Sequence, residues 1–297
     1  MKNLLIIASI CLFFACGGSK NVVQHAPKTT TTEYTTPEEN TETPKIVAPI
    51  EEKAPEPKTE EEPPKPKAAA EKEEEEEKPK TVSKALSHQP WNTLLAKHVS
   101  ADGIVNYKGF KQDRAQFRTY LKALEQNAPG KTASKADKLA YWMNVYNAFT
   151  IKLIIDKYPI KSIKDIADPW DLRFFKIGTT WYTLNDIEHR ILRKMNDPRI
   201  HFGINCASFS CPPLLNKAFT AQNVDQELEK LAIAFINDPK RNTITAEKIE
   251  ISKIFSWFGK DFKKEGSLID FLNKYSNIVI NTDAKKSFKA YDWSLNE

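Results

Sequence analysis

Residues 197–214, DPRIHFGINCASFSCPPL, hold side chains whose types and spacing suit chemistry. A cysteine thiolate can act as a nucleophile, a histidine can serve as its base, and an asparagine amide can orient a group or stabilise an oxyanion. The candidate residues in this segment are Arg199, His201, Asn205, Cys206 and Cys211. We take the two cysteines and His201 as candidate catalytic residues, and Arg199 and Asn205 as candidate ligand-binding residues.

The two cysteines allow two exclusive interpretations. A catalytic cysteine must be free and ionisable, whereas two nearby cysteines in an oxidising compartment can form a disulfide. Because only four residues separate Cys206 from Cys211, we expect their Cα atoms to lie within about 7 Å of each other. Cys211 directly precedes Pro212, which predicts a short helix running to Ala218. The dipole of such a helix would favour a thiolate at its N-terminus.

The residues before this turn predict a short strand. Apolar and polar side chains alternate over residues 199–205, which is the period of a strand with one buried face. The prolines that follow Cys211 cannot donate to a ladder, so the strand must end before them. The alternation places Cys206 on the face opposite His201. A Cys206 nucleophile would therefore need a further turn, or His189, to reach its base.

A long buried helix is predicted over residues 134–157. Its first residues, Ser134 to Asp137, resemble a capping box, and the rest is apolar on nearly every side. Asn144 and Asn147 lie on one side of this helix and must find hydrogen-bond partners there. They either hold neighbouring loops or orient a bound group, and we include both as candidate ligand-binding residues.

A second helix carries a carboxylate among apolar positions. The residues from Thr183 to Asp186 predict its start, and Glu188 falls among the residues of its apolar face. A buried carboxylate is usually paired, so Glu188 makes a structural ion pair or belongs to a polar site with perturbed proton affinity. His189 lies next to it on a more polar side. Both are candidate catalytic residues.

The remaining patterns predict a single helix-rich α+β domain with short strands and hairpins. Strands do not alternate regularly with helices, which argues against a doubly wound sheet. Hairpins are predicted over residues 174–184 and 242–252, and a strand-like segment over 291–295. Helical spacing is found over 91–98, 113–126, 224–235, 254–262 and 268–275.

The N-terminal end has the layout of a secretory signal. Lys2 supplies a positive charge, an apolar run extends from Leu4 to Phe14, and Cys16 follows a small residue. This arrangement resembles a bacterial lipobox, although Phe13 stands where a leucine-like residue is usual. The resemblance implies a signal peptide over residues 1–15 and lipidation of Cys16, which would anchor the protein to the bacterial cell envelope. Gly17 after the cysteine favours the outer membrane.

Residues 16–84 predict a disordered linker. They contain 10 of the 18 prolines and long runs of glutamate, a composition that buries too little apolar surface to fold. Residues 85–297 carry 32 Lys and Arg against 23 Asp and Glu, so the domain is basic and suits an anionic envelope partner. The basic residues are scattered without aromatic interleaving, and we expect no nucleic-acid partner.

Four separated motifs occur in order: KLAYWMNVYNAFTIKLI, TLNDIEHRILR, DPRIHFGINCASFSCPPL and the terminal YDWSLN. Together they resemble the domain-of-unknown-function 547 family over residues 85–297. The resemblance implies one domain, often exported in bacteria, and it supplies no reaction. The motif residues it implies here are Asn144, Asn147, Glu188, His189, His201, Asn205, Cys206 and Cys211.

Two functions follow from these patterns. The favoured one is a lipid-anchored module that binds an anionic or peptide-like envelope ligand. The alternative is a cysteine-dependent amide hydrolase or acyltransferase with a mechanism like that of papain or the transglutaminases. It would use Cys206 or Cys211 with His189 or His201. Neither requires a cofactor. The spacing of the cysteines and histidines matches no standard zinc pattern, so we assign no metal ligands.

Overall fold

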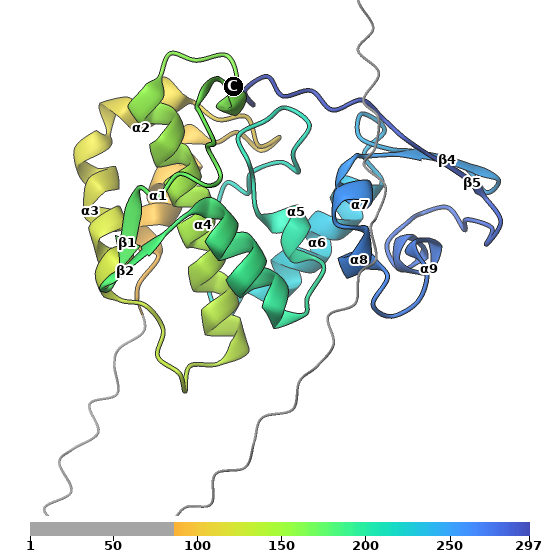
Figure 1. Cartoon of the computed structure of the whole chain (residues 1–297), viewed down its shortest axis with the longest axis horizontal. Helices are drawn as coiled ribbons and strands as arrows, with labels where there is room; N and C mark the ends of the chain where they lie inside the picture. The colour runs from red at the N-terminus through yellow and green to blue at the C-terminus, as the bar shows by residue number, and fades with distance from the viewer. Residues whose placement is uncertain (1–85) are drawn as a thin grey trace, which may run out of the picture. The chain divides into compact units, whose positions relative to one another are not determined.

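Helix α4 (Lys135–Lys157) is the element against which much of the domain packs (Figure 1). It begins where the Ser134 side chain accepts a hydrogen bond from the amide of Asp137, as the capping pattern predicts. Fifteen of its residues are buried and they face several directions, which confirms the predicted buried helix. It contacts α2, α3, α6, the segment Asp186–Ile191 that carries Glu188 and His189, and the following segment Leu192–Met195.

The computed structural model describes residues 86–297, and the predicted signal peptide, Cys16 and the predicted linker lie outside the described residues. The other helices are α1 (Gln89–His98), α2 (Tyr107–Gln112), α3 (Arg114–Gln126), η1 (Ile163–Asp165), η2 (Asp186–Ile191), η3 (Leu192–Met195), α5 (Ile200–Gly203), α6 (Val224–Ile236), α7 (Ile254–Trp257), α8 (Gly259–Phe262) and α9 (Leu268–Asn273). The strands are β1 (Phe175–Ile177), β2 (Thr180–Tyr182), β3 (Thr243–Ile244), β4 (Lys248–Ile251) and β5 (Lys285–Phe288). None of the described helices is long and apolar enough to cross a membrane.

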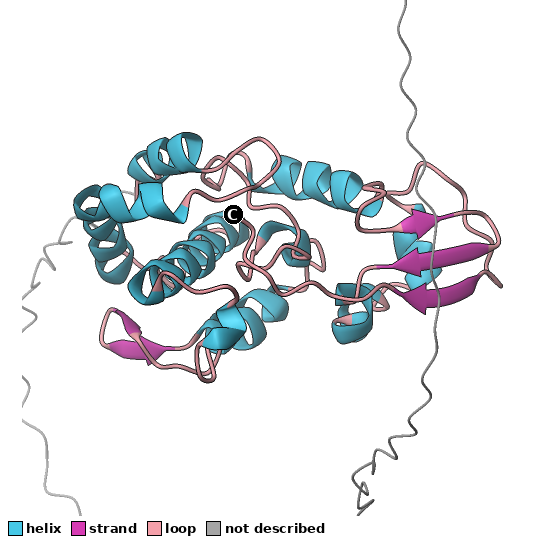
Figure 2. Ribbon diagram, turned by 90° about the horizontal axis from the view of Figure 1, so that it is seen from above, coloured by secondary structure: helices cyan, strands magenta, loops and turns pink. Residues whose placement is uncertain are grey.

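The strands form two small sheets, so the domain is helix-rich α+β as predicted. Strands β1 and β2 make the first predicted hairpin, and Gly178 supplies the positive φ of its turn. The second predicted hairpin pairs β3 with β4. A third strand, β5, lies parallel to β4 (Figure 2). Strand β5 has no counterpart among the predicted elements, because its residues, KKSF, are all exposed and show no alternation.

Two apolar clusters make up the core. The larger one surrounds α4 and includes buried residues of α1, α3, β1 and η2. The smaller one joins α6 and β4 to α7, α8 and α9. Helix α5 lies between the clusters, because Ile200 and Ile204 belong to the first and Phe202 to the second. This short helix therefore connects the two halves of the core.

The predicted strand over residues 199–205 is wrong. Residues 200–203 form one helical turn, and Ile204 and Asn205 follow in an extended segment. Residues i and i+4 of a helix lie on one face, while residue i+2 points to nearly the opposite side. Buried apolar residues at 200, 202 and 204 therefore fit a helical turn held between two clusters as well as they fit a strand.

Two further expectations need correction. Residues 212–218 form no helix, so Cys211 has no helix dipole beside it. The helix predicted after Thr183 is present, and the side chains of Thr183 and Asp186 cap it reciprocally. However, its first part, η2, is a π-helical turn and its second part, η3, is a 3-10 turn. Wide π turns are frequent at functional sites.

Candidate functional site

One cavity of about 220 Å³ brings together the candidate catalytic residues. Its walls come from η2, α5, α7, the turn after Ile204 and the C-terminal segment. All five candidates line it: Glu188, His189, His201, Cys206 and Cys211. Aromatic side chains form much of the remaining surface: Tyr146, Trp170, Trp257, Phe258, Tyr291 and Trp293. The cavity is thus a mainly apolar site with a few convergent polar groups, as ligand-binding sites usually are.

Glu188 is a buried carboxyl group at this site. Its side chain is 8% exposed, and Oε2 accepts a hydrogen bond of 3.2 Å from the hydroxyl of Tyr146. Burial raises the pKa of Glu188 to about 7, because desolvation outweighs the hydrogen bond from Tyr146 and the charge of Arg193. Glu188 can therefore hold or release a proton near neutral pH.

His201 is oriented by Asp261 of α8. Its Nε2 lies 2.9 Å from Asp261 Oδ2, and its ring stacks on Phe258 with centroids 4.0 Å apart. Arg193 also binds Asp261, with Nε donating to Oδ2 at 2.6 Å and a second nitrogen donating to Oδ1 at 3.2 Å. Burial alone would raise the pKa of Asp261, but the hydrogen bonds from His201 and Arg193 hold it well below its usual range. Asp261 is therefore ionised.

The Nδ1 atom of His201 is a free acceptor inside the site. Because Nε2 faces an ionised carboxylate, Nε2 carries the proton of the neutral ring. Nδ1 is buried and has no hydrogen-bond partner among residues 86–297. Its nearest carboxyl oxygen, Glu188 Oε1, lies 3.9 Å away. Burial lowers the pKa of His201 more strongly than Asp261 raises it, so the ring stays neutral. An unpartnered buried acceptor is costly unless a ligand or water satisfies it.

His189 lies beside this pair, with its Nδ1 accepting from Arg193 at 2.7 Å. Burial and then the charge of Arg193 lower the pKa of His189. This residue therefore contributes a neutral ring to the site. Arg193 connects His189 to Asp261 and so fixes the relative positions of both polar groups.

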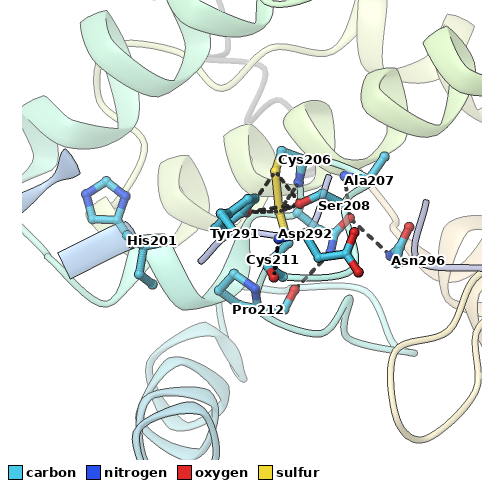
Figure 3. The surroundings of a disulfide bond; sticks show 12 residues. His201, Cys206, Ala207, Ser208, Cys211, Pro212, Tyr291, Asp292 and Asn296 are labelled. Atoms are coloured by element: carbon cyan, nitrogen blue, oxygen red, sulfur yellow. Dashed lines mark hydrogen bonds between the residues drawn. A yellow bond between two sulfur atoms is a disulfide. The ribbon is translucent and has the colours of Figure 1, made fainter. Parts of the chain in front are cut away.

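Cys206 and Cys211 form a disulfide with their Cα atoms 6.3 Å apart (Figure 3). The expectation of bridging distance is confirmed. In this form neither sulfur is a thiolate, so a cysteine nucleophile would require the reduced protein. The hydroxyl of Tyr291 lies 3.3 Å from Cys211 Sγ and 3.5 Å from Cys206 Sγ. Tyr291 is thus the pocket residue that interacts with both sulfurs.

The four candidate ligand-binding residues do not line the cavity. Asn144 clamps the backbone of Phe219 through both atoms of its amide. Asn147 donates to the carbonyl of Gly203 and accepts from the amide of Asn205, so it holds both ends of the segment behind His201. These hydrogen bonds make the two asparagines positioning residues for the site.

Asn205 and Arg199 also bind protein groups. Asn205 donates to the carbonyl of Pro212 and accepts from the amide of Ala207, which shapes the cysteine turn. Arg199 forms ion pairs with carboxylates of Asp197, Asp225 and Glu229. Asp225 and Glu229 belong to α6. Arg199 therefore ties the start of α5 to α6.

Several site residues were not among the candidates. Asp261 lies beside Lys260 in the pattern FGKDF. Its position between Phe258 and Phe262 of an aromatic stripe is the signal that could have indicated it. Arg193 lies four residues after His189, which is neighbour spacing on a helix. Tyr146 and Trp293 carried no comparable signal, because aromatic residues are more often packing elements than site residues.

The chain matches no curated protein and no solved structure. Among the described residues, no group of three or more His, Cys, Asp and Glu side chains is arranged to hold a metal ion. All eight family-motif residues fall between Lys131 and Ile236, whereas the terminal YDWSLN lies beyond. Residues 131–236, which extend to the end of α6, match the model of the family described as protein of unknown function, DUF547.

Proposed function

We propose that the domain binds a small peptide-like ligand of the bacterial cell envelope in the aromatic cavity. The observation that carries this proposal is the unpartnered Nδ1 of His201 within an otherwise aromatic wall. Nδ1 would accept a hydrogen bond from an amide N–H after a small movement of the side chains that cover it. Glu188, protonated below about pH 7, would donate to a carbonyl oxygen. An amide group of the ligand has both the N–H donor and the carbonyl acceptor that these two side chains need.

The lining favours a neutral ligand over an anionic one. None of the residues around the cavity is Lys or Arg, and Arg193 nearby is already paired with Asp261. The positive charge of the domain therefore lies elsewhere on its surface. The cavity is also smaller than the about 300 to 1,000 Å³ of sites for drug-sized ligands, so it suits the end of a chain or a single residue.

Tryptophan fluorescence of the full chain, titrated with N-acetyl dipeptide amides and with the same dipeptides as free carboxylates, tests this proposal. We expect the neutral amides to change the emission of Trp257 and Trp293, because both indoles line the cavity. The variant His201→Gln should weaken binding about tenfold through loss of a buried hydrogen bond. The matched control Trp181→Phe, on the exposed face of β2, should bind like the parent protein. Equal binding by His201→Gln would contradict the proposal.

We also propose that the protein is a lipoprotein anchored through Cys16. Metabolic labelling with a clickable fatty acid tests this proposal. The signal layout and the cysteine after a small residue support this. The parent protein should incorporate the label and Cys16→Ala should not, while Cys11→Ala serves as the control. Labelling that persists in Cys16→Ala would overturn the anchor. The membrane is then a partner through the lipid alone.

A second candidate function is a cysteine-dependent amide hydrolase or acyltransferase. It is favoured by the convergence of Cys206, His201 and Glu188 on one cavity. In the reduced protein, a histidine would take the proton of Cys206, the resulting thiolate would attack the amide carbon, and the amine would leave with that proton from the histidine. Water or a second amine would then release the acyl group from the thioester. Release of a fluorogenic amine should require reductant and vanish in Cys206→Ser; turnover without reductant would contradict it.

A further inference from the structure

One backbone amide and two hydroxyl groups surround the sulfur of Cys211. The amide N–H of Cys206 lies 3.0 Å from Cys211 Sγ, and the hydroxyls of Ser208 and Tyr291 each lie 3.3 Å from it. A disulfide sulfur is only a weak acceptor, whereas a thiolate is a strong one. These donors therefore stabilise the reduced, ionised form of Cys211 more than its oxidised form.

The protons on the two hydroxyls can be assigned consistently. Ser208 lies 3.0 Å from Tyr291 and can donate to it, while Tyr291 donates to Cys211 Sγ. Burial raises the pKa of Tyr291 to about 12, so the phenol keeps its proton at neutral pH. Ser208 is fully buried and polarises the phenol further. The result is a chain of donors that ends at the disulfide. The two hydroxyls also lie 3.4 and 3.5 Å from Cys206 Sγ, so the amide N–H of Cys206, at 3.0 Å, is the contact that distinguishes Cys211.

The two sulfurs differ in access. Both cysteines line the cavity, but Cys206 is partly exposed whereas Cys211 is only 3% exposed. Thiol–disulfide exchange needs an attacked sulfur that the incoming thiolate can reach and a leaving sulfur that is stable as a thiolate. Cys206 satisfies the first condition and Cys211 satisfies the second.

The turn that carries the cysteines is held without the disulfide. The C-terminal segment pairs with it through the amide of Phe209 donating to Ser294 at 2.6 Å and the amide of Ser210 donating to Asp292 at 3.1 Å. The amide of Asn296 donates back to Ala207 at 3.3 Å. Since these hydrogen bonds do not involve the sulfurs, we expect the turn to keep its shape and its donors after reduction.

From these contacts we propose that Cys206–Cys211 is a redox-active disulfide that exchanges with an exported dithiol protein. The thiolate of the dithiol attacks Cys206 Sγ and forms a new S–S bond, while the Cys206–Cys211 bond breaks and its electron pair leaves on Cys211. The second thiol of the partner then attacks the mixed disulfide and releases Cys206 as a thiol. The pair is thereby reduced and the dithiol oxidised. This inference does not depend on the proposed ligand.

Mapping of the mixed disulfide tests the direction of attack. The oxidised full chain is incubated with reduced glutathione, quenched in acid, digested without reductant and analysed by mass spectrometry. We expect glutathione on Cys206 and a free thiol on Cys211. Glutathione mainly on Cys211 would overturn the assignment of the leaving sulfur. No adduct on the folded chain would overturn redox activity and make the disulfide a structural clasp.

Variants that remove the hydroxyls of Tyr291 and Ser208 test whether these groups stabilise the departing thiolate or only pack against the disulfide. Tyr291→Phe keeps the ring and removes the donor, so the rate of glutathione exchange should fall about tenfold, because the departing thiolate loses a charge-assisted hydrogen bond. Ser208→Ala should slow it less. Tyr158→Phe, which loses a hydroxyl bonded to Glu297 at the surface, should exchange like the parent. If Tyr291 merely shielded the sulfurs, its variant would exchange faster, and that result would contradict the proposal.

Discussion

At the scale of single residues, the site depends on groups whose pKa values are shifted by their surroundings. Asp261 is ionised and fixes the proton of His201 on Nε2, which leaves Nδ1 as an acceptor. Glu188 nearby is partly protonated at neutral pH. Two titratable groups whose environments shift them in different directions are typical of functional sites, although structural networks also do this.

Glu188 should make stability depend on pH. Its pKa is about 7 in the folded protein and near 4.5 when unfolded, so between these values the folded state keeps a proton that the unfolded chain has lost. The contribution of this group to stability is therefore favourable below about pH 4.5 and lost as the pH rises to about 7, by on the order of 3 kcal/mol. Urea denaturation of Glu188→Gln should lack this component. The variant should gain stability relative to the parent between pH 4.5 and 8.

Glu250→Gln is the control for that comparison, because Glu250 is exposed. Histidines with lowered pKa values oppose the trend in the parent protein, so only the difference between parent and Glu188→Gln is diagnostic. If the two curves run parallel from pH 4.5 to 8, the carboxyl of Glu188 does not titrate in this window.

Asn147 should stabilise the protein through its backbone partners. In Asn147→Ala, the carbonyl of Gly203 and the amide of Asn205 stay buried without a partner, which should cost about 1 to 3 kcal/mol in urea denaturation. Asn281→Ala, at an exposed asparagine, should change stability by less than about 0.5 kcal/mol. Equal stabilities of the two variants would contradict the positioning role.

At the scale of elements, α5 is a single helical turn that must fit between two apolar clusters. Its last residue, Gly203, packs where α4 and α6 approach it. A Cβ atom there would meet the side chain of Met143, with Leu228 at 3.0 Å and Phe219 at 3.2 Å. Glycine therefore permits the close packing that positions His201 two residues earlier.

Gly203→Ala should destabilise the domain by about 1 to 3 kcal/mol, because the added methyl group overpacks a closed region. Gly130→Ala is a matched control, since no atom lies within 4 Å of the Cβ it would add. Urea denaturation compares the two. A Gly203→Ala protein as stable as Gly130→Ala would show that α4 and α6 can move apart at low cost.

At the scale of the whole described domain, the C-terminal segment connects distant parts of the chain. Asn296 accepts from the hydroxyl of Tyr107 in α2 at 2.6 Å, and its amide reaches Asn205 beside the cysteine turn at 3.3 Å. Tyr291 and Trp293 of the same segment line the cavity. The segment thereby couples the packing of the first helices to the site.

Asn296→Ala should lower stability by about 1 to 3 kcal/mol, because it leaves the Tyr107 hydroxyl and neighbouring buried groups without a partner. Tyr107→Phe should also destabilise the protein. Since both changes remove the same hydrogen bond, the double variant should cost less than the sum of the single ones. Strict additivity in thermal or urea unfolding would indicate that the two side chains do not interact.

The sequence by itself determined the elements whose signals are local. The capping residues and long apolar run of α4, the Gly178 hairpin and the periodic stripe of α6 each specify their element without help from distant residues. The local pattern also predicts that Asn144, Asn147 and Glu188 are buried, because a polar residue within an apolar helix face is buried together with that face. The short turn also placed Cys206 and Cys211 within bridging distance. These predictions are confirmed.

Only the tertiary structure decided the rest. The alternation of residues 199–205 is equally compatible with a strand and with a helical turn packed between two apolar clusters. The second of these clusters forms from residues far along the chain. The same contacts bring Asp261 to His201 across 60 positions and Tyr291 to Cys211 across 80. Which nitrogen of His201 is free, and which phenol donates to the disulfide, depends on these long-range contacts, because no local pattern encodes a partner so distant in sequence.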